Sequence, residues 1–191
     1  MGKLGRSLGY ALAVTAFATA TATAAPAHAG WNTLPDGLEG TPQTRWERFE
    51  HGDGRAWFDI NQPGTAYEGR NNGWFHVGNG WAASRIRMDL STGAISQHLF
   101  QCHASAWIHP LTPAGTQVGI EIWDPNGWQP LAKSYQWVAG GGYRGINTQS
   151  VDLRYRSRQL YVQVIYGNTN GTKTWVRFDD VSISCKNPYP V

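Results

Sequence analysis

The sequence has little charge and no cluster of lysine or arginine. Charged residues make up 15% of the chain, and its formal net charge is +3. Lys3 and Arg6 lie in the N-terminal leader, so the chain without that leader carries a net charge of only +1. Proteins that bind nucleic acid present a concentrated basic surface. The composition therefore predicts no nucleic-acid partner.

Long apolar runs are absent beyond the first 29 residues. In that stretch Lys3 and Arg6 precede the apolar run LGYALAVTAFATATATAA, and Ala27-His28-Ala29 follows it. This order is typical of a cleaved secretory signal peptide. A membrane anchor is the alternative, but the run is interrupted by threonine and a span needs about 20 apolar residues. We expect residues 1–29 to be removed, and the mature protein to be secreted and not associated with a membrane.

Only two cysteines are present, Cys102 and Cys185, and they lack the CxxC spacing of a metal site. An even number of cysteines in an exported chain favours a disulfide. A pair of buried free thiols is the alternative. We expect Cys102 and Cys185 to be bonded.

Helix signals are also scarce, and short alternating segments take their place. They are separated by turn signals such as HGDG, NQPG, DPNG and GNTNG. This pattern predicts an all-β sandwich or barrel, formed by one domain over residues 30–191 with its core at about 34–185. We expect residues 30–43 to form an ordered entry segment without regular secondary structure. The expected strands are 44–49, 55–60, 73–77, 82–90, 101–109, 116–124, 134–139, 148–153, 159–166 and 174–184.

The tripeptide Asn-Gly-Trp occurs three times, at 72–74, 79–81 and 126–128. Asn-Gly suits tight hairpin turns, so each motif is expected to place a tryptophan just beyond a bend. These indoles either staple the hairpin ends to the sandwich or remain exposed for binding.

Alternation divides each strand into a core row and an outer row. In CHASAWIH the core row is Cys102, Ala104, Ala106 and Ile108. The outer rows are unusual because they mix Trp and Tyr with polar side chains. Outward aromatics are covered either by a crossing loop, such as 140–147, or by a flat ligand such as a sugar ring. The candidate carbohydrate-binding residues are Trp107, Trp123, Glu121, Tyr161, Gln163, Trp175 and Arg177.

The last strand, WVRFDDVSISC, changes register in its middle. Val176 and Phe178 are even-numbered core residues, whereas Val181 and Ile183 are odd-numbered. One extra residue at Asp179-Asp180, a β-bulge, produces this shift. A buried carboxylate there needs hydrogen bonds or a cation, which Arg177, Lys186 or a metal would supply.

Three segments resemble galactose-binding-like jelly-roll carbohydrate-binding modules. LPDGLEG followed by Trp46 is similar to their opening GFE-G…W motif, and WVRFDDVSISC to their closing iDDV strand. The middle segment, CHASAWIHP…VGIEIWD, resembles their paired central strands. The resemblance spans most of residues 34–185, and Leu38 stands where those modules usually carry an aromatic. It implies a two-sheet jelly-roll β-sandwich that is non-catalytic and binds polysaccharide.

The same resemblance implies a structural calcium ion held by Glu39 and Asp179, which match the acidic residues of the opening and closing motifs. The partner it implies is a polysaccharide or a cell-wall glycan, and we expect the protein to be a monomer. These modules are usually joined to an enzyme, and no such segment is seen in this sequence.

Two other functions stay open. One is a secreted protein-interaction or wall-structural sandwich, because Trp, Tyr and Arg are also favoured at protein interfaces. The other is a glycan-active hydrolase that uses Glu121. Such an enzyme needs a second carboxylate at a defined distance, and the sequence does not pair one with Glu121.

Overall fold

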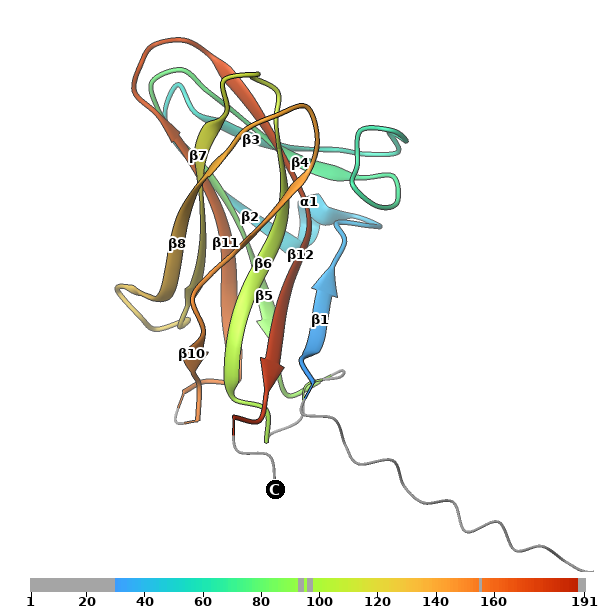
Figure 1. Ribbon diagram of the computed structural model, residues 1–191, viewed down its shortest axis with the longest axis vertical. Helices are drawn as coiled ribbons and strands as arrows, with labels where there is room; N and C mark the ends of the chain where they lie inside the picture. Colours follow the sequence, from blue (N-terminus) through green and yellow to red (C-terminus); the bar gives the residue numbers. More distant parts are fainter. Residues whose placement is uncertain (1–29, 93–94, 96–97, 155, 189–191) are drawn as a thin grey trace, which may run out of the picture.

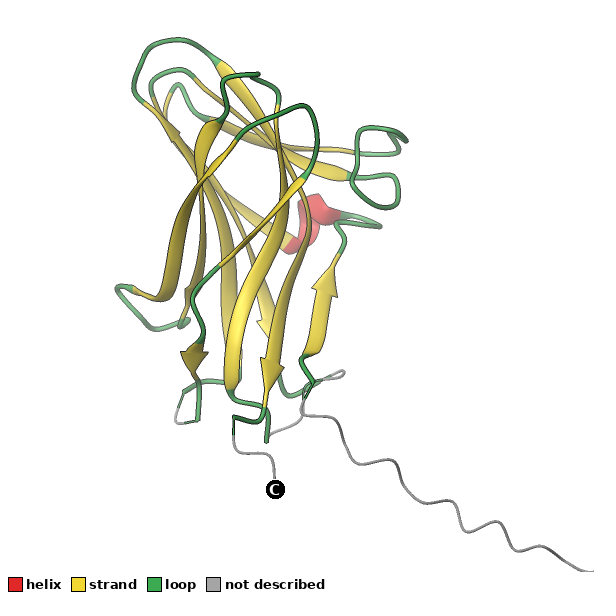
Figure 2. Cartoon of the chain, viewed as in Figure 1, coloured by secondary structure: helices red, strands yellow, loops and turns green. Residues whose placement is uncertain are grey.

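The computed structural model describes residues 30–92, 95, 98–154 and 156–188. The predicted signal peptide lies outside these residues. The described chain is built almost entirely of strands, which form two antiparallel sheets packed face to face. Figure 1 shows β1, β12 and β6 side by side, and Figure 2 shows loops gathered at the two ends of the sandwich. The predicted all-β, two-sheet jelly-roll sandwich is confirmed.

The larger sheet has seven strands. Its main path is β10-β6-β12-β4-β3, and β1 and β9 pair with β12 and β6 respectively. The strands of this sheet are β1 (Asn32–Asp36), β3 (Arg55–Asp59), β4 (Asn72–Val77), β6 (Gln101–Pro110), β9 (Arg144–Asn147), β10 (Val151–Asp152) and β12 (Thr174–Lys186).

The smaller sheet has five strands in the order β2-β5-β11-β7-β8. They are β2 (Trp46–Gly52), β5 (Gly80–Asp89), β7 (Thr116–Trp123), β8 (Pro130–Val138) and β11 (Gln159–Asn168). A four-residue helix, α1 (Pro42–Arg45), leads directly into β2.

The core lies between the sheets and consists of the predicted inward rows. Cys102, Ala104 and Ile108 are fully buried, as are Val118, Ile120 and Ile122 on β7. A cluster of aromatic rings closes one part of the core, where Phe178 stacks on Phe75 with ring centroids 4.8 Å apart. Sorting residues by alternation therefore identified the buried faces correctly.

The predicted bulge is present in β12. Pairing with β6 shifts between Asp179 and Ser182, and Asp180 takes a positive φ of 42°. The extra residue returns Val181 and Ile183 to the inner face, where both are fully buried like Phe178. The bulge thus keeps both halves of the strand in one core.

The segment at 30–43 differs from its prediction as irregular. Asn32–Asp36 forms β1, which pairs antiparallel with the end of β12. The predicted strand at 148–153 is also different, since only Val151–Asp152 is a strand there and Arg144–Asn147 forms β9 just before it. Neither segment alternates over more than a few residues, so hydrogen bonding to a long neighbouring strand decides its conformation.

Two of the three Asn-Gly motifs lie at turns, between β4 and β5 and between β7 and β8. The turn predicted at Asn72-Gly73 is wrong, because both residues belong to β4. Gly73 is required there for packing, since a Cβ at this position would lie 2.1 Å from the Phe178 ring.

The Cys102–Cys185 disulfide is confirmed, and it joins a cross-strand pair of β6 and β12. Both cysteines are fully buried. Among the described residues no helix is long and apolar enough to cross a membrane.

Replacing both cysteines with alanine should destabilise the fold by about 4–5 kcal/mol, because the disulfide closes a loop with a sequence separation of 83. The free energy of unfolding, measured by urea denaturation under oxidising conditions, checks this value. A loss below about 1 kcal/mol would show that the bond constrains the unfolded chain far less than its loop length implies.

Candidate functional site

The structure divides the seven predicted carbohydrate-binding residues between two opposite surfaces. We call the outer surface of the seven-stranded sheet the A face and that of the five-stranded sheet the B face. Trp107, Trp175 and Arg177 lie on strands of the A face. The other four, Glu121, Trp123, Tyr161 and Gln163, are neighbours on the B face. The set is therefore not one site.

Cross-strand pairing on the A face brings together aromatic residues that are far apart in the sequence. Trp57 of β3 pairs with Trp74 of β4, and Trp74 pairs with Arg177 of β12. One step along, Trp175 pairs with His76. Trp57 and Trp175 remain 50% and 42% exposed. We call Trp57, Trp74 and Trp175 the indole strip.

Neighbouring groups fix the orientation of each indole. The Trp74 Nε1–H donates to Asp59 Oδ1 over 3.1 Å. The Trp175 ring stacks on His76, with centroids 4.1 Å apart and planes 18° apart. The guanidinium of Arg48 lies 4.0 Å from the centroid of the Trp57 ring. The strip is therefore held in place before any ligand arrives.

Two hollows adjoin the strip, and Trp74 lines both of them. The first, of about 280 Å³, is lined by Asp59, Gln62, Trp74, Leu111, Trp175 and Arg177. The second, of about 500 Å³, is lined by Arg48, Glu50, Arg55, Ala56, Trp57 and Trp74. Each combines an aromatic face with a carboxylate and a guanidinium, which accept and donate hydrogen bonds respectively.

The histidines of this surface favour their neutral form. Partial burial lowers the pKa of His76, and the charge of Lys173 lowers it further, while Asp53 acts in the opposite direction. Burial also lowers the pKa of His109, and the nearby Arg177 adds to the effect. At neutral pH the imidazole that stacks on Trp175 is therefore an uncharged ring.

The other half of the A face is covered by two loops of the chain. The Tyr67 ring stacks on Trp107 with centroids 4.0 Å apart and planes 13° apart. Tyr143, from the loop before β9, lies 5.2 Å from His109 between ring centroids, and its hydroxyl donates to the Thr65 carbonyl. A loop cover, which the sequence left open as one alternative, therefore applies to Trp107. The indole strip lies outside this cover.

Asp179 anchors the covering loop. Its Oδ2 accepts hydrogen bonds from the backbone N–H groups of Tyr67 and Glu68, at 2.7 and 3.1 Å, and Oδ1 accepts one from Asp180. The side chain is fully buried. Burial raises the pKa of this carboxyl to about 6, although the three amide donors oppose that shift.

This raised pKa predicts a pH-dependent stability. The folded-state pKa lies above the unfolded value, so the contribution of Asp179 is fully present below pH 4 and is lost as pH rises toward 6. The stability of wild type relative to Asp179→Asn should therefore fall by roughly 2 kcal/mol from pH 4 to pH 7. Urea denaturation at both pH values measures it.

Asp152→Asn is the matched control, since hydrogen bonds from Arg154 lower the pKa of the exposed Asp152 and its trend has the opposite sign. A difference between wild type and Asp179→Asn that does not vary with pH would show that Asp179 ionises with an ordinary pKa.

Glu39 makes the same kind of contact as Asp179. Its Oε1 accepts hydrogen bonds from the backbone N–H groups of Arg70 and Asn71, at 2.8 and 3.1 Å. Calcium requires six to eight oxygen ligands, whereas these carboxylates face amide donors. No group of three or more His, Cys, Asp or Glu in the described ranges is placed to hold a metal. In the structure both carboxylates are therefore held by backbone amides, and these contacts do not need the calcium ion that the resemblance implied.

The thermal midpoint of the purified protein should consequently be the same in excess calcium and in excess chelator. Differential scanning calorimetry measures it. A midpoint that falls on chelation and recovers with calcium would instead establish a site, and loss of that response in Glu39→Gln would place it.

On the B face, Glu121 is the centre of a hydrogen-bond cluster. Its Oε2 accepts from Trp123 Nε1 at 2.7 Å and from Gln163 Nε2 at 2.9 Å, and its Oε1 accepts from the Tyr135 hydroxyl at 2.6 Å. Only 4% of Glu121 is exposed. The predicted residues Glu121, Trp123 and Gln163 are therefore one cluster, and Tyr161 is the cross-strand neighbour of Trp123.

The cluster does not supply the carboxylate pair of a glycoside hydrolase. Glu47 is the other carboxylate in the row of Glu121, and Arg85 and Gln163 stand between them. Three strand spacings place the two residues about 14 Å apart, beyond the 6.5–9.5 Å of inverting enzymes. Glu47 is also paired with Arg85, at 2.6 Å. The hydrolase alternative therefore gains no support from this geometry.

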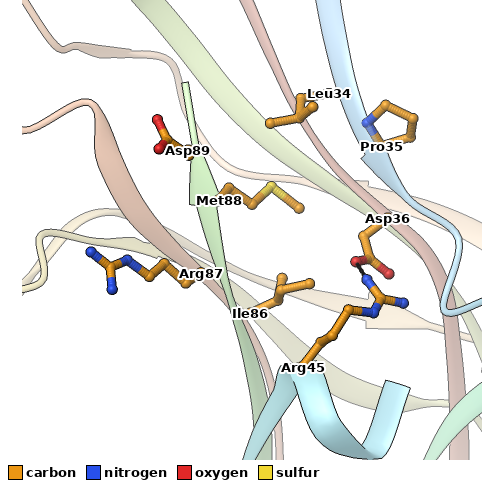
Figure 3. Close-up of a pocket in the computed structure, with 8 residues that line it drawn as sticks. All are labelled: Leu34, Pro35, Asp36, Arg45, Ile86, Arg87, Met88 and Asp89. Atoms are coloured by element: carbon orange, nitrogen blue, oxygen red, sulfur yellow. Dashed lines mark hydrogen bonds and ion pairs between the residues drawn. The ribbon is translucent and has the colours of Figure 1, made fainter. Parts of the chain in front are cut away.

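A hollow of about 370 Å³ also opens between β1 and β5 (Figure 3). Leu34, Ile86 and Met88 form its apolar wall, and the ion pair of Arg45 with Asp36 forms one rim. Among the residues that the structure describes, no aromatic ring lines it. It offers less to a sugar than the indole strip does.

Sequence reasoning missed Trp57 and did not assign Trp74 to the site. The outward position of Trp57 is visible from alternation in RAWFD, between the buried Ala56 and Phe58. Its position beside Trp74 depends on strand order, for which the sequence carries no local signal.

No protein-family model matches the chain, and no curated protein matches it. Solved structures do match in fold. A Stig cyclase, FisC, of Fischerella sp. TAU, solved in complex with (3Z)-3-(1-methyl-2-pyrrolidinylidene)-3H-indole, has a TM-score of 0.57 and 14% identity, covering 83% of this chain and 90% of its own.

Two carbohydrate-binding modules match similarly. The family 11 module of Clostridium thermocellum, in complex with a β-1,3-1,4-mixed-linked tetrasaccharide, has a TM-score of 0.50 and 12% identity, covering 81% and 95% of the two chains. The xylan-binding domain of family 22 has a TM-score of 0.50 and 14% identity, covering 86% and 99%. The resemblance is confirmed at the level of the fold: this chain has the jelly-roll β-sandwich of carbohydrate-binding modules.

Proposed function

We propose that this protein is a secreted, non-catalytic polysaccharide-binding protein whose ligand lies on the indole strip of the A face. The observation that carries the proposal is the strip itself. Its indoles are partly exposed, oriented by hydrogen bonding and stacking, and flanked by hollows that contain Asp59, Arg177, Glu50 and Arg55. The CH face of a sugar ring stacks on indole while its hydroxyls reach such polar neighbours.

The free energy that binding requires calls for more than one stacking contact. Covering half of an indole face removes roughly 100 Å² from water, which contributes about 2.5 kcal/mol. Millimolar affinity requires about 4.1 kcal/mol after the cost of association. One tryptophan is therefore too little. Stacking on Trp57 and Trp175, with one hydrogen bond accepted by Asp59 and one donated by Arg177, gives an affinity in the micromolar to millimolar range.

Two of the predicted A-face residues, Trp175 and Arg177, belong to this site. Arg177 Nε lies 3.9 Å from Asp59 Oδ2, and Asp59 also binds the indole of Trp74. Asp59 thus joins both side chains and retains acceptor capacity for a hydroxyl. The proposed site does not use Trp107, whose ring is already stacked against Tyr67.

Trp175→Ala and Trp57→Ala should each weaken binding at this site by at least about tenfold, because each removes one stacking surface. Isothermal titration with soluble mixed-linked glucan, xylan and galactan measures the affinity. Thermal midpoints should change little, since both indoles are about half exposed.

Trp128→Ala is the matched control, because Trp128 is 97% exposed in the turn between β7 and β8 and has no part in the strip. Equal binding by all three variants and wild type would refute the A-face site. If no polysaccharide binds but one protein co-purifies, the interaction alternative replaces the proposed function.

A further inference from the structure

The B face has a second pair of exposed indoles at one end. Trp81, at the start of β5, is 37% exposed, and Trp137, near the end of β8, is 68% exposed. Trp81 pairs with Gly167, and Trp137 pairs with Gln117. The order β5-β11-β7-β8 places the two indoles three strands apart, or about 14 Å. A glycine and a glutamine thus lie between two aromatic walls.

A hollow of about 760 Å³ opens at this end of the sheet, and Trp81 and Trp137 both line it. The other lining groups include Gln117, Asn168, Asn170 and several threonines. In the part of the chain that the structure describes, no charged side chain lines the hollow. Amides and hydroxyls donate and accept hydrogen bonds without carrying charge. The hollow therefore suits a ligand that is rich in hydroxyls and uncharged.

The next row of the B face is rigid. The Tyr135 ring lies over Gly119, where a Cβ would come within 2.6 Å of it. The Tyr135 hydroxyl donates to the buried Glu121, and burial, with help from that carboxylate, raises the pKa of Tyr135 to about 12. Tyr135 is nevertheless 47% exposed. A neutral aromatic surface thus continues from the hollow toward the centre of the sheet.

We propose that this region of the B face, comprising Trp81, Trp137, Tyr135 and the hollow between the two indoles, is a second polysaccharide-binding site that takes an uncharged chain. This inference rests on the proposed function of the A face and extends it. Because the two sites lie on opposite outer surfaces of a two-sheet sandwich, a single short oligosaccharide cannot occupy both. The protein is then bivalent and cross-links polysaccharide chains.

The charge of the lining residues decides whether a neutral or an acidic polysaccharide suits this site. The hollows of the A face contain Asp59, Arg177, Glu50 and Arg48. The described residues that line the B-face hollow include no such group to balance a uronate or sulfate, so an acidic ligand would lose water there without gaining a charged partner. Binding of a protein to this face, in place of a polysaccharide, would overturn the proposal.

The experiment uses the full mature chain and two soluble neutral polysaccharides, mixed-linked glucan and xylan, with polygalacturonate as the acidic comparison. Turbidity and light scattering report cross-linking, and titration calorimetry with short oligosaccharides of the same polymers reports stoichiometry. The variants are Trp81→Ala/Trp137→Ala for the B face, Trp57→Ala/Trp175→Ala for the A face, and Trp128→Ala as the control.

Wild type and Trp128→Ala are expected to bind two oligosaccharides per chain and to cross-link neutral polymer. Each double variant should bind one oligosaccharide per chain and should no longer cross-link neutral polymer. Affinity at the altered face should fall by roughly tenfold or more. Polygalacturonate should not compete at the B face.

The outcomes distinguish the two proposals. One oligosaccharide per wild-type chain, lost in the A-face variant and unchanged in the B-face variant, overturns the second site and leaves the proposed function intact. If oligosaccharide binding is lost only in the B-face variant, the A-face site is refuted instead. Binding of no polysaccharide, or capture of a protein by the B face alone, overturns the second site.

Discussion

The arrangement of the A face depends on the buried carboxylate of Asp179. The bulge inserts one residue into β12, so that the strand keeps its core residues inward on both sides of the insertion. Asp179 is thereby free to bind the backbone amides of Tyr67 and Glu68 rather than solvent. Leaving this carboxylate without donors would be costly, so the loop that carries Tyr67 must close onto the sheet.

That loop closure decides which aromatic residues of the A face remain available. Tyr67 stacks on Trp107, and Tyr143 packs beside it, so the half of the face near β6 is occupied by the protein itself. The cover does not reach Trp57 and Trp175, which stay half exposed. On the B face, Glu121 is likewise a buried carboxylate that positions aromatic side chains. It accepts hydrogen bonds from Trp123, Gln163 and Tyr135. Both faces therefore use a carboxylate that is saturated with donors to hold aromatic side chains or the loops that bear them.

The sequence was sufficient for features that depend on local periodicity. Alternation identified the buried rows, and the parity change at Asp179-Asp180 identified the bulge. The disulfide was indicated by two cysteines in a chain that the sequence predicts to be exported. Strand order is different, because it depends on hydrogen bonds between segments that lie far apart in the chain. For this reason the sequence did not show that Trp57 and Trp74 lie beside Arg177, or that Trp107 and Trp123 lie on opposite surfaces. The backbone amides that bind Glu39 and Asp179 likewise have no side-chain signature.

The fold alone does not decide the function, since the same sandwich occurs in carbohydrate-binding modules and in a cyclase. The state of the carboxylates is more informative. A general acid or base must reach the substrate with a hydrogen bond, but Glu121 is 4% exposed and its oxygens already accept from three donors. Asp59, by contrast, is partly exposed beside an exposed indole and a guanidinium, with acceptor capacity left for a hydroxyl. A buried, saturated carboxylate and an accessible one beside aromatic rings suit the recognition of a sugar better than proton transfer to it.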